Sequence, residues 1–496
     1  MKRYYPIIIA LSIVKLVIHL IGNQNYGFHR DELLHLSVSE HLDWGYFEFP
    51  PFIAFGGKVA HFLFGYSLSG VRLFPTLAGM GILIICCFIA KELGGKRYAV
   101  LLAGVTVLSF VPFYRNHLLF QPVAFDQFFW TLGFYFLIKY FNTKANRYLI
   151  LLGIIFGIGL MNKYTILVWG FGVFIGLFFY DKGKSFKNKW FYIAGIISFL
   201  IVLPNIVWQW SHEFPLLLHM EKLKESQLDN GGTFDFATKQ LKHPFTLIIS
   251  LIGLYAYFFD STLRKYKTFG VTVVVIFFAM WLMQSKDYYF FAVYPILFAA
   301  GAVKIEKMLH RKPKWNYLVA TVLILPAIPF IPGAIPILPI ATYVDYLDLK
   351  PEDDERIVLT DDFADMFGWE EQVQLVDSLY RSLPVAKREK CMIWAENYGE
   401  AGAIEILGDK YKLPSPMSSH GSFWTWGPGN TQAEIYISIG NEQHAVESVF
   451  SDYTLVKIIK HKYAIGEENN IPVYLCSNPK IDIKHNWKLL EKHVFD

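Results

Sequence analysis

Residues 71–90 read VRLFPTLAGMGILIICCFIA, and residues 91–97 continue as KELGGKR. A run of twenty residues with one charge is long enough for an α-helix to cross the hydrocarbon layer, which requires about 20 mainly apolar residues. Three of the next seven residues are basic, which is typical of a cytoplasmic loop. The stretch therefore predicts a membrane-spanning helix that ends in the cytoplasm.

Similar apolar runs recur through the first 340 residues and predict about eleven spans. The first run contains Lys15 and His19 and no small-residue cleavage site, so we interpret it as a retained span rather than a signal peptide. The predicted spans are residues 5–22, 71–90, 98–113, 123–138, 148–162, 165–180, 190–207, 245–260, 268–283, 289–303 and 315–340.

The charge balance divides the chain at about residue 340. Residues 1–340 contain 31 Lys and Arg against 16 Asp and Glu, whereas residues 341–496 contain 15 against 26. A sparsely charged, basic part followed by a densely charged, acidic part excludes a single soluble enzyme, a disordered chain and a disulfide-rich secreted scaffold. Nucleic-acid binding is also disfavoured, because the basic residues lie between apolar segments. We expect a transmembrane domain over 1–340 and a soluble α/β domain over 341–496.

The loops that contain most of the basic residues alternate along the chain. They follow the second, fourth, sixth, eighth and tenth predicted spans, and with the N-terminus they hold 20 of the 31 Lys and Arg of residues 1–340. The positive-inside rule assigns these loops to the cytoplasm. An odd number of spans then places the acidic C-terminal domain outside, and it places most acidic residues of the membrane part at the outer surface.

Carboxylates gather in the first outer loop. Asp31 and Glu32 begin a predicted surface helix, and Glu48 precedes Pro50-Pro51. Acidic residues at a helix start are candidates for catalysis, although ordinary capping of the helix is the alternative. Asp126 lies one turn inside the fourth span, where an ionisable group is costly and suggests a functional site. The alternative role for Asp126 is a structural salt bridge with Arg115 or Arg72.

Four cations on the predicted outer side are candidates to bind phosphate. They are Arg72, Arg115, Lys163 and Lys286. A lone lysine at the membrane surface is usually an interfacial anchor, whereas several cations near carboxylates would form an anion site. His219 and Glu221 in the segment 207–243 are weak candidates for a divalent metal, and no other cofactor is indicated.

An ordered set of short motifs resembles the polyprenyl-phosphate-sugar glycosyltransferases of the GT-C fold, which include protein O-mannosyltransferases and aminoarabinose transferases. The matching pieces are Asp31-Glu32, Gly45-Tyr46 with Pro50-Pro51, Phe64-Gly65 with Val71-Arg72-Leu73, Gln121-Pro122-Val123 with Asp126, Asn162-Lys163-Tyr164, Leu203-Pro204-Asn205 with Trp208-Gln209, and Ser285-Lys286 with Tyr294-Pro295. Asn397–Ala403 and Trp424–Pro428 are similar to the extra domain of bacterial members.

The resemblance implies a bacterial inner-membrane enzyme that transfers sugar from a polyprenyl-phosphate donor, with inversion of the anomeric configuration, to a glycan, lipid or protein acceptor on the outer face. It implies that Asp31 is the base, with Asp126 in support, and that Lys163, Lys286 and Arg115 hold phosphate. The family's aminoarabinose transferases have Glu-Lys before a Pro where this chain has Glu48-Phe49-Pro50, which disfavours a lipid A acceptor.

Two further points remain open at this stage. A transporter or flippase of lipid-linked sugars is the rival class, although it should place ionisable residues near the bilayer midplane in two similar halves. Four cysteines show no metal-binding spacing. Cys391 and Cys476 could pair outside the cytoplasm, but free buried thiols are the favoured interpretation.

Overall fold

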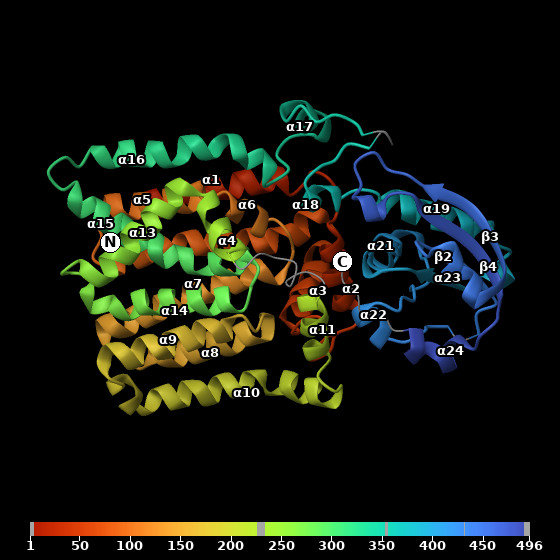
Figure 1. Cartoon of the computed structure of the whole chain (residues 1–496), viewed down its shortest axis with the longest axis horizontal. Helices are drawn as coiled ribbons and strands as arrows, with labels where there is room; N and C mark the ends of the chain where they lie inside the picture. Colours follow the sequence, from red (N-terminus) through yellow and green to blue (C-terminus); the bar gives the residue numbers. More distant parts are fainter. Residues whose placement is uncertain (1–3, 226–233, 353–355, 431, 491–496) are drawn as a thin grey trace.

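The computed structural model describes residues 4–225, 234–352, 356–430 and 432–490. A bundle of long helices forms one part of the molecule, and an α/β unit covers one end of that bundle (Figure 1). We call residues from 341 onward the C-terminal unit. The arrangement matches the predicted fold class, a helical membrane protein with an α/β unit after it.

Each predicted span overlaps a helix of the bundle. These helices are α1 Tyr5–Gly22, α4 Leu68–Glu92, α5 Arg97–Ser109, α7 Pro122–Thr143, α8 Arg147–Asn162, α9 Ile166–Asp181, α10 Lys189–Ser211, α13 Pro244–Phe259, α14 Lys267–Leu282, α15 Tyr294–Met308 and α16 Trp315–Ile324, which continues as the 3₁₀ segment Leu325–Gly333. Among the described residues six helices are long and apolar enough to cross a membrane, or seven if a pair bent by 108° is one span. The predicted number of eleven is therefore not confirmed.

Small residues allow the bundle helices to pack closely. A Cβ at Gly153 of α8 would lie 2.4 Å from the carbonyl oxygen of Ala194 in α10, so only glycine permits this approach. At Gly176 of α9 a Cβ would lie 2.7 Å from the carbonyl oxygen of Thr268 in α14. Because lipid tails are as apolar as the helix faces, such close packing is a main source of helix association in membranes.

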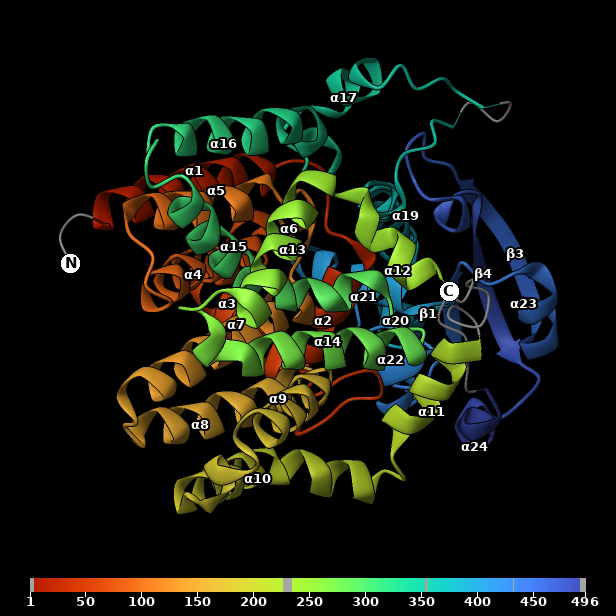
Figure 2. The same ribbon diagram turned by 60° about the vertical axis from the view of Figure 1, so that its left-hand side comes forward.

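Short helices lie between the bundle and the C-terminal unit. They are α2 Arg30–Glu40, α3 Phe52–Phe64, α6 Pro112–Asn116 and α11 Pro215–Leu223, with α12 Asp235–Lys239 nearby. Figures 1 and 2 show α2 and α3 at the end of the bundle that the C-terminal unit covers. The helix predicted in the first loop is therefore present as α2, but it does not lie on a surface, because the C-terminal unit covers it and most of its residues, including Leu33 and Leu36, are buried.

The C-terminal unit contains a four-stranded mixed sheet in the order β1-β2-β4-β3. Its strands are β1 Cys391–Ala395, β2 Ile435–Ile439, β3 Phe450–Ile459 and β4 Ile471–Pro479; its helices are α17 Ile340–Tyr346, α18 Asp361–Ala364, α19 Trp369–Ser382, α20 Val385–Arg388, α21 Tyr398–Leu407, α22 Gly421–Thr425, α23 Gln443–Val449 and α24 Ile483–Asn486. β1 runs parallel to β2, with Ile393 opposite Ile437, and the other pairs are antiparallel. The sequence predicts strands at residues 391–396, 434–439, 454–459 and 471–476 and helices at residues 399–407 and 445–450, and each of these overlaps an observed element. All four cysteines are buried and free, as favoured.

Candidate functional site

The first turn of α2 is organised by a capping box. His29 Nδ1 accepts a hydrogen bond from the backbone N–H of Asp31 at 3.1 Å, and Glu32 Oε2 accepts one from the backbone N–H of His29 at 3.0 Å. Such a box satisfies N–H groups that a helix start leaves unpaired. The capping role considered for the acidic pair therefore belongs to Glu32.

Glu32 and Arg72 form an ion pair in the protein interior. Both side chains are 0% exposed, and Arg72 Nη2 lies 2.7 Å from Glu32 Oε2. Arg72 also donates to the carbonyls of Asn25 and Gly27, while Glu32 Oε1 accepts from the backbone N–H of Phe120 at 2.9 Å. The structure thus places Arg72 against Glu32 and not with the other three candidate cations.

Asp31 lies on a different side of the same turn. Its Oδ2 accepts a hydrogen bond from Gln121 Nε2 at 2.8 Å, and its Oδ1 accepts one from the Tyr398 hydroxyl at 3.2 Å. Burial alone would raise the pKa of Asp31, but nearby basic groups, with His29 the strongest, outweigh burial and hold the pKa below its ordinary value. Asp31 is therefore an ionised carboxylate that can accept a proton.

Arg115 connects Asp31 to the C-terminal unit. Its guanidinium contacts Gln121 Oε1 at 3.4 Å and Asp362 Oδ1 at 2.5 Å, and it lies 6.0 Å from the centre of the Tyr288 ring. The sequence left open a salt bridge between Asp126 and Arg115 or Arg72. In the structure Arg115 pairs with Asp362 and Arg72 with Glu32 instead.

Asp126 is buried in α7 and is held by neutral donors. Trp130 Nε1 donates to one oxygen at 3.0 Å, and Thr165 Oγ1 donates to the other at 2.8 Å. The ammonium of Lys163 is close enough to act on Asp126 electrostatically. Asp126 is therefore hydrogen-bonded to neutral donors and lies within electrostatic range of Lys163.

Lys163 and Lys286 both lie near Tyr289. Lys163 Nζ lies 4.0 Å from the centre of the Tyr289 ring and 5.6 Å from that of Tyr288, and Lys286 acts on Tyr289 through space. Because the Tyr288 ring also lies near Arg115, contacts run from Asp31 through Gln121, Arg115 and Tyr288 to Lys163. Asp126 is linked to Lys163 only electrostatically. The structure thus brings together five of the predicted site residues, which we call the Asp31 group: Asp31, Arg115, Asp126, Lys163 and Lys286.

Glu48 lies apart from this group, against the C-terminal unit. Its carboxylate accepts hydrogen bonds from the backbone N–H of Ser422, at 2.8 Å, and from the Ser422 hydroxyl. Burial raises the pKa of Glu48. The contact is one of docking between the first loop and α22.

The weak metal candidates His219 and Glu221 both lie in α11. His219 packs edge-on against Phe47, with ring centres 6.2 Å apart, and Glu221 is exposed. Across the described ranges, no group of three or more His, Cys, Asp or Glu residues is arranged to hold a metal ion.

Several functional candidates could not be found from sequence reasoning. Gln121 and Tyr288-Tyr289 occur within the motifs, but nothing in their spacing marked them as site residues. Asp362 and Tyr398 are separated from Asp31 by more than 300 residues, so only the fold brings them to it.

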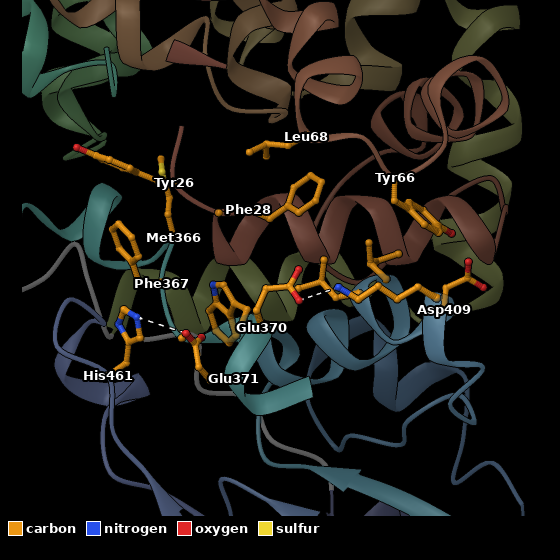
Figure 3. A pocket seen from close by; sticks show the side chains of 16 residues that line it. Tyr26, Phe28, Tyr66, Leu68, Met366, Phe367, Glu370, Glu371, Asp409 and His461 are labelled. Atoms are coloured by element: carbon orange, nitrogen blue, oxygen red, sulfur yellow. Dashed lines mark hydrogen bonds and ion pairs between the residues drawn. The ribbon is translucent and has the colours of Figure 1, made fainter. Parts of the chain in front are cut away.

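A separate cavity of about 590 Å³ lies where the bundle meets the C-terminal unit. Figure 3 shows Phe28 and Tyr66 on the bundle side, with Phe367 and His461 across the cavity. Its acidic side chains include Glu371, which lies 3.7 Å from His461. None of the predicted site residues lines this cavity, so it is distinct from the Asp31 group.

Comparisons with known proteins establish the fold. The family model described as dolichyl-phosphate-mannose-protein mannosyltransferase matches residues 48–208. ArnT from Cupriavidus metallidurans, solved with bound undecaprenyl phosphate, is similar with a TM-score of 0.64 and 12% identity, over 94% of this chain and 97% of that one. The Archaeoglobus fulgidus oligosaccharyltransferase, solved with zinc and sulfate, is similar with a TM-score of 0.51 and 10% identity, over 88% and 68%.

A comparison with curated proteins gave no match. The structural likenesses show that the chain has the GT-C fold of multi-pass membrane glycosyltransferases. The resemblance read from the sequence motifs is thereby confirmed at the level of the fold.

Proposed function

We propose that the chain is a glycosyltransferase that moves a sugar from a polyprenyl-phosphate donor to an acceptor hydroxyl at the outer face of the bacterial cytoplasmic membrane. The observation that supports this most directly is the set of contacts that links Asp31, through Arg115 and Tyr288, to Lys163. It supplies a carboxylate base and an anion site side by side, which this reaction requires.

The reaction is a single displacement. The acceptor oxygen attacks the anomeric carbon, Asp31 takes the hydroxyl proton, and the bond between that carbon and the phosphate oxygen breaks with its electron pair. The leaving polyprenyl phosphate gains negative charge, which Lys163, Lys286 and Arg115 stabilise. Attack from the face opposite the leaving group inverts the anomeric configuration.

The remaining candidates take supporting roles in this proposal. Glu32 and Arg72 fix the start of α2, since both side chains are fully buried and face each other. Asp126 balances the charge of Lys163 through space, and Glu48 anchors the first loop to α22. The acceptor is a glycan, lipid or protein hydroxyl.

The experiment uses the donor that accumulates in cells. Lipids extracted from cells that lack the protein should contain more of one polyprenyl-phosphate sugar than wild-type cells. That lipid, incubated with the purified protein and wild-type cell-envelope material, should release polyprenyl phosphate. An unchanged lipid pool together with no release would contradict the proposal.

A flippase of lipid-linked sugars is the second candidate, because ionisable residues do occur inside the bundle. Lys15 is 1% exposed and its Nζ lies 3.2 Å from His19 Nε2. Such residues are common in transport pathways. The same assay separates the two functions, because a flippase would move the lipid across a vesicle membrane without releasing polyprenyl phosphate.

A further inference from the structure

The first turn of α2 is connected to the C-terminal unit at successive residues. His29 Nε2 lies 3.4 Å from Asp365, Arg30 contacts Asp365 and Glu467 at 3.1 Å each, and Asp31 accepts the Tyr398 hydroxyl. His29 and Arg30 share Asp365, whereas Asp31, whose side chain points about 100° away from that of Arg30, reaches Tyr398 instead. The C-terminal unit therefore encloses the turn that presents Asp31.

Tyr398 is the first residue of α21 and is 7% exposed. Its ring lies under the Arg30 guanidinium at 5.8 Å and meets the His420 ring edge-on at 5.2 Å. Burial, and next the charge of Asp31, raise the pKa of Tyr398 well above its ordinary value. The hydroxyl therefore keeps its proton and acts as a donor to Asp31.

The position of Tyr398 is set by close packing of α21 on α2. A Cβ at Gly399 would lie 2.8 Å from Arg30 Cγ, and one at Gly402 would lie 3.0 Å from the backbone carbon of Leu33. Asn397 caps the start of α21 by accepting the backbone N–H of Gly399 at 2.8 Å. A Gly-x-x-Gly turn after a strand can also suggest a phosphate site, but the contacts of Gly399 and Gly402 support close helix packing instead.

From this geometry we infer that Tyr398 is a positioning residue for Asp31, so that the C-terminal unit completes the transfer site. Gln121 and Tyr398 each donate to one carboxylate oxygen and so fix the plane of the carboxylate. Each oxygen keeps a second lone pair, one of which accepts the proton of the acceptor hydroxyl. Both partners are neutral, so the carboxylate is oriented without being neutralised by an ion pair.

The inference rests on the proposed function, and Tyr398→Phe tests it because this substitution removes only the hydroxyl. The expected result is a fall in kcat of about tenfold, with donor binding unchanged, since a hydrogen bond to a charged group is lost. Tyr453→Phe is the matched control, because the Tyr453 hydroxyl also donates to a carboxylate, Glu447, within the same unit but on the sheet.

The pH profile separates positioning from a structural role. A donor to the ionised carboxylate lowers its pKa, so loss of the hydroxyl should raise the pKa of Asp31 and move the acid limb of the kcat profile to higher pH. The other charged and titratable groups around Asp31 are the same in the wild type and in Tyr398→Phe, so a shift of the acid limb reports the loss of the hydroxyl. These groups are His29, Arg30, His35, Arg115, Tyr288, Asp362 and Asp365.

The outcomes are distinct. If the wild-type protein releases no polyprenyl phosphate, the proposed function fails. If the wild type is active and Tyr398→Phe matches it in kcat and in acid limb, the inference about Tyr398 is overturned. A loss of kcat with an unmoved acid limb also overturns it, because that result indicates a structural role alone.

Discussion

Asp31 and Glu32 are neighbours in sequence, but their side chains serve different partners. Asp31 accepts hydrogen bonds from two neutral donors, whereas Glu32 faces a buried guanidinium. Only Asp31 is therefore available to take a proton. Asp31→Asn keeps the size of the side chain and removes the basic oxygen, so transfer should fall by roughly 10²-fold or more. Binding of the polyprenyl-phosphate donor, measured on the purified variant, should persist; near-normal turnover would assign the base elsewhere.

Glu32→Gln should act on stability instead of chemistry. It leaves the charge of Arg72 buried without a counter-charge, and breaking such a pair costs about 3–5 kcal/mol. We expect a lower thermal unfolding midpoint in detergent. Glu40→Gln on the same helix is the control, because the contacts of Glu40 with Lys58 and His61 are partly exposed and should contribute about 1 kcal/mol or less. Equal midpoints for the two variants would contradict the assignment.

Lys163→Ala and Lys286→Ala should weaken binding of the donor. Loss of one charge-assisted contact to phosphate costs on the order of 2 kcal/mol. Lys267→Ala provides a control, since Lys267 lies over the Phe258 ring at 5.8 Å as an interfacial lysine would. Binding of polyprenyl phosphate to the three purified variants can be compared directly. If all three bind it like the wild type, the two lysines near Tyr289 are anchors only.

At the scale of helices and strands, periodicity and hydrophobicity were sufficient predictors. Each of the eleven apolar runs overlaps a helix, because a chain segment in lipid satisfies its backbone hydrogen bonds internally as a helix. Contacts between elements were not predictable. The sequence favoured a structural or acceptor-recruiting role over a phosphate site for the Gly399-x-x-Gly402 turn, but it could not name the residues that the two glycines contact, Arg30 and Leu33, which lie more than 360 residues earlier. Such pairs follow from tertiary packing, which local sequence does not encode.

The contact between α2 and α21 gives a prediction at the same scale. A Cβ at Gly402 would approach the Leu33 backbone to 3.0 Å, and a backbone atom cannot move aside cheaply. Gly402→Ala should lower the free energy of unfolding by about 1–3 kcal/mol, as overpacking does. Gly466→Ala is the control, because its Cβ would meet only a side-chain atom at 3.4 Å. Thermal unfolding of both variants measures the difference, and equal stabilities would show that α21 adjusts freely.

At the scale of the whole molecule, the basic loops gather at one end of the bundle. Figure 1 shows the α7–α8, α9–α10, α13–α14 and α15–α16 connections at the end opposite the C-terminal unit. Acidic residues at this end form ion pairs with the basic ones: Glu92 pairs with Lys139 at 3.1 Å, and Asp260 pairs with Lys304 at 3.0 Å. The alternation of charge seen in the sequence therefore corresponds to two physical ends of the fold. The Asp31 group lies at the other end. This placement follows from the pattern of charge over all the loops and could not be predicted from any one span.

This separation of charge determines the predicted orientation in the membrane. Cytoplasmic loops carry an excess of Lys and Arg, so the end that holds the basic loops should face the cytoplasm and the C-terminal unit should face outward. A reporter active only outside the cytoplasm, fused after Asp496, should be active, and the same reporter fused after Gly95, in the loop between α4 and α5, should be silent. A reporter that works only in the loop fusion would reverse the topology. Nucleotide sugars are confined to the cytoplasm, which is why an enzyme that acts outside needs a lipid-linked donor. A reversed topology would place the Asp31 group in the cytoplasm and would remove that reason.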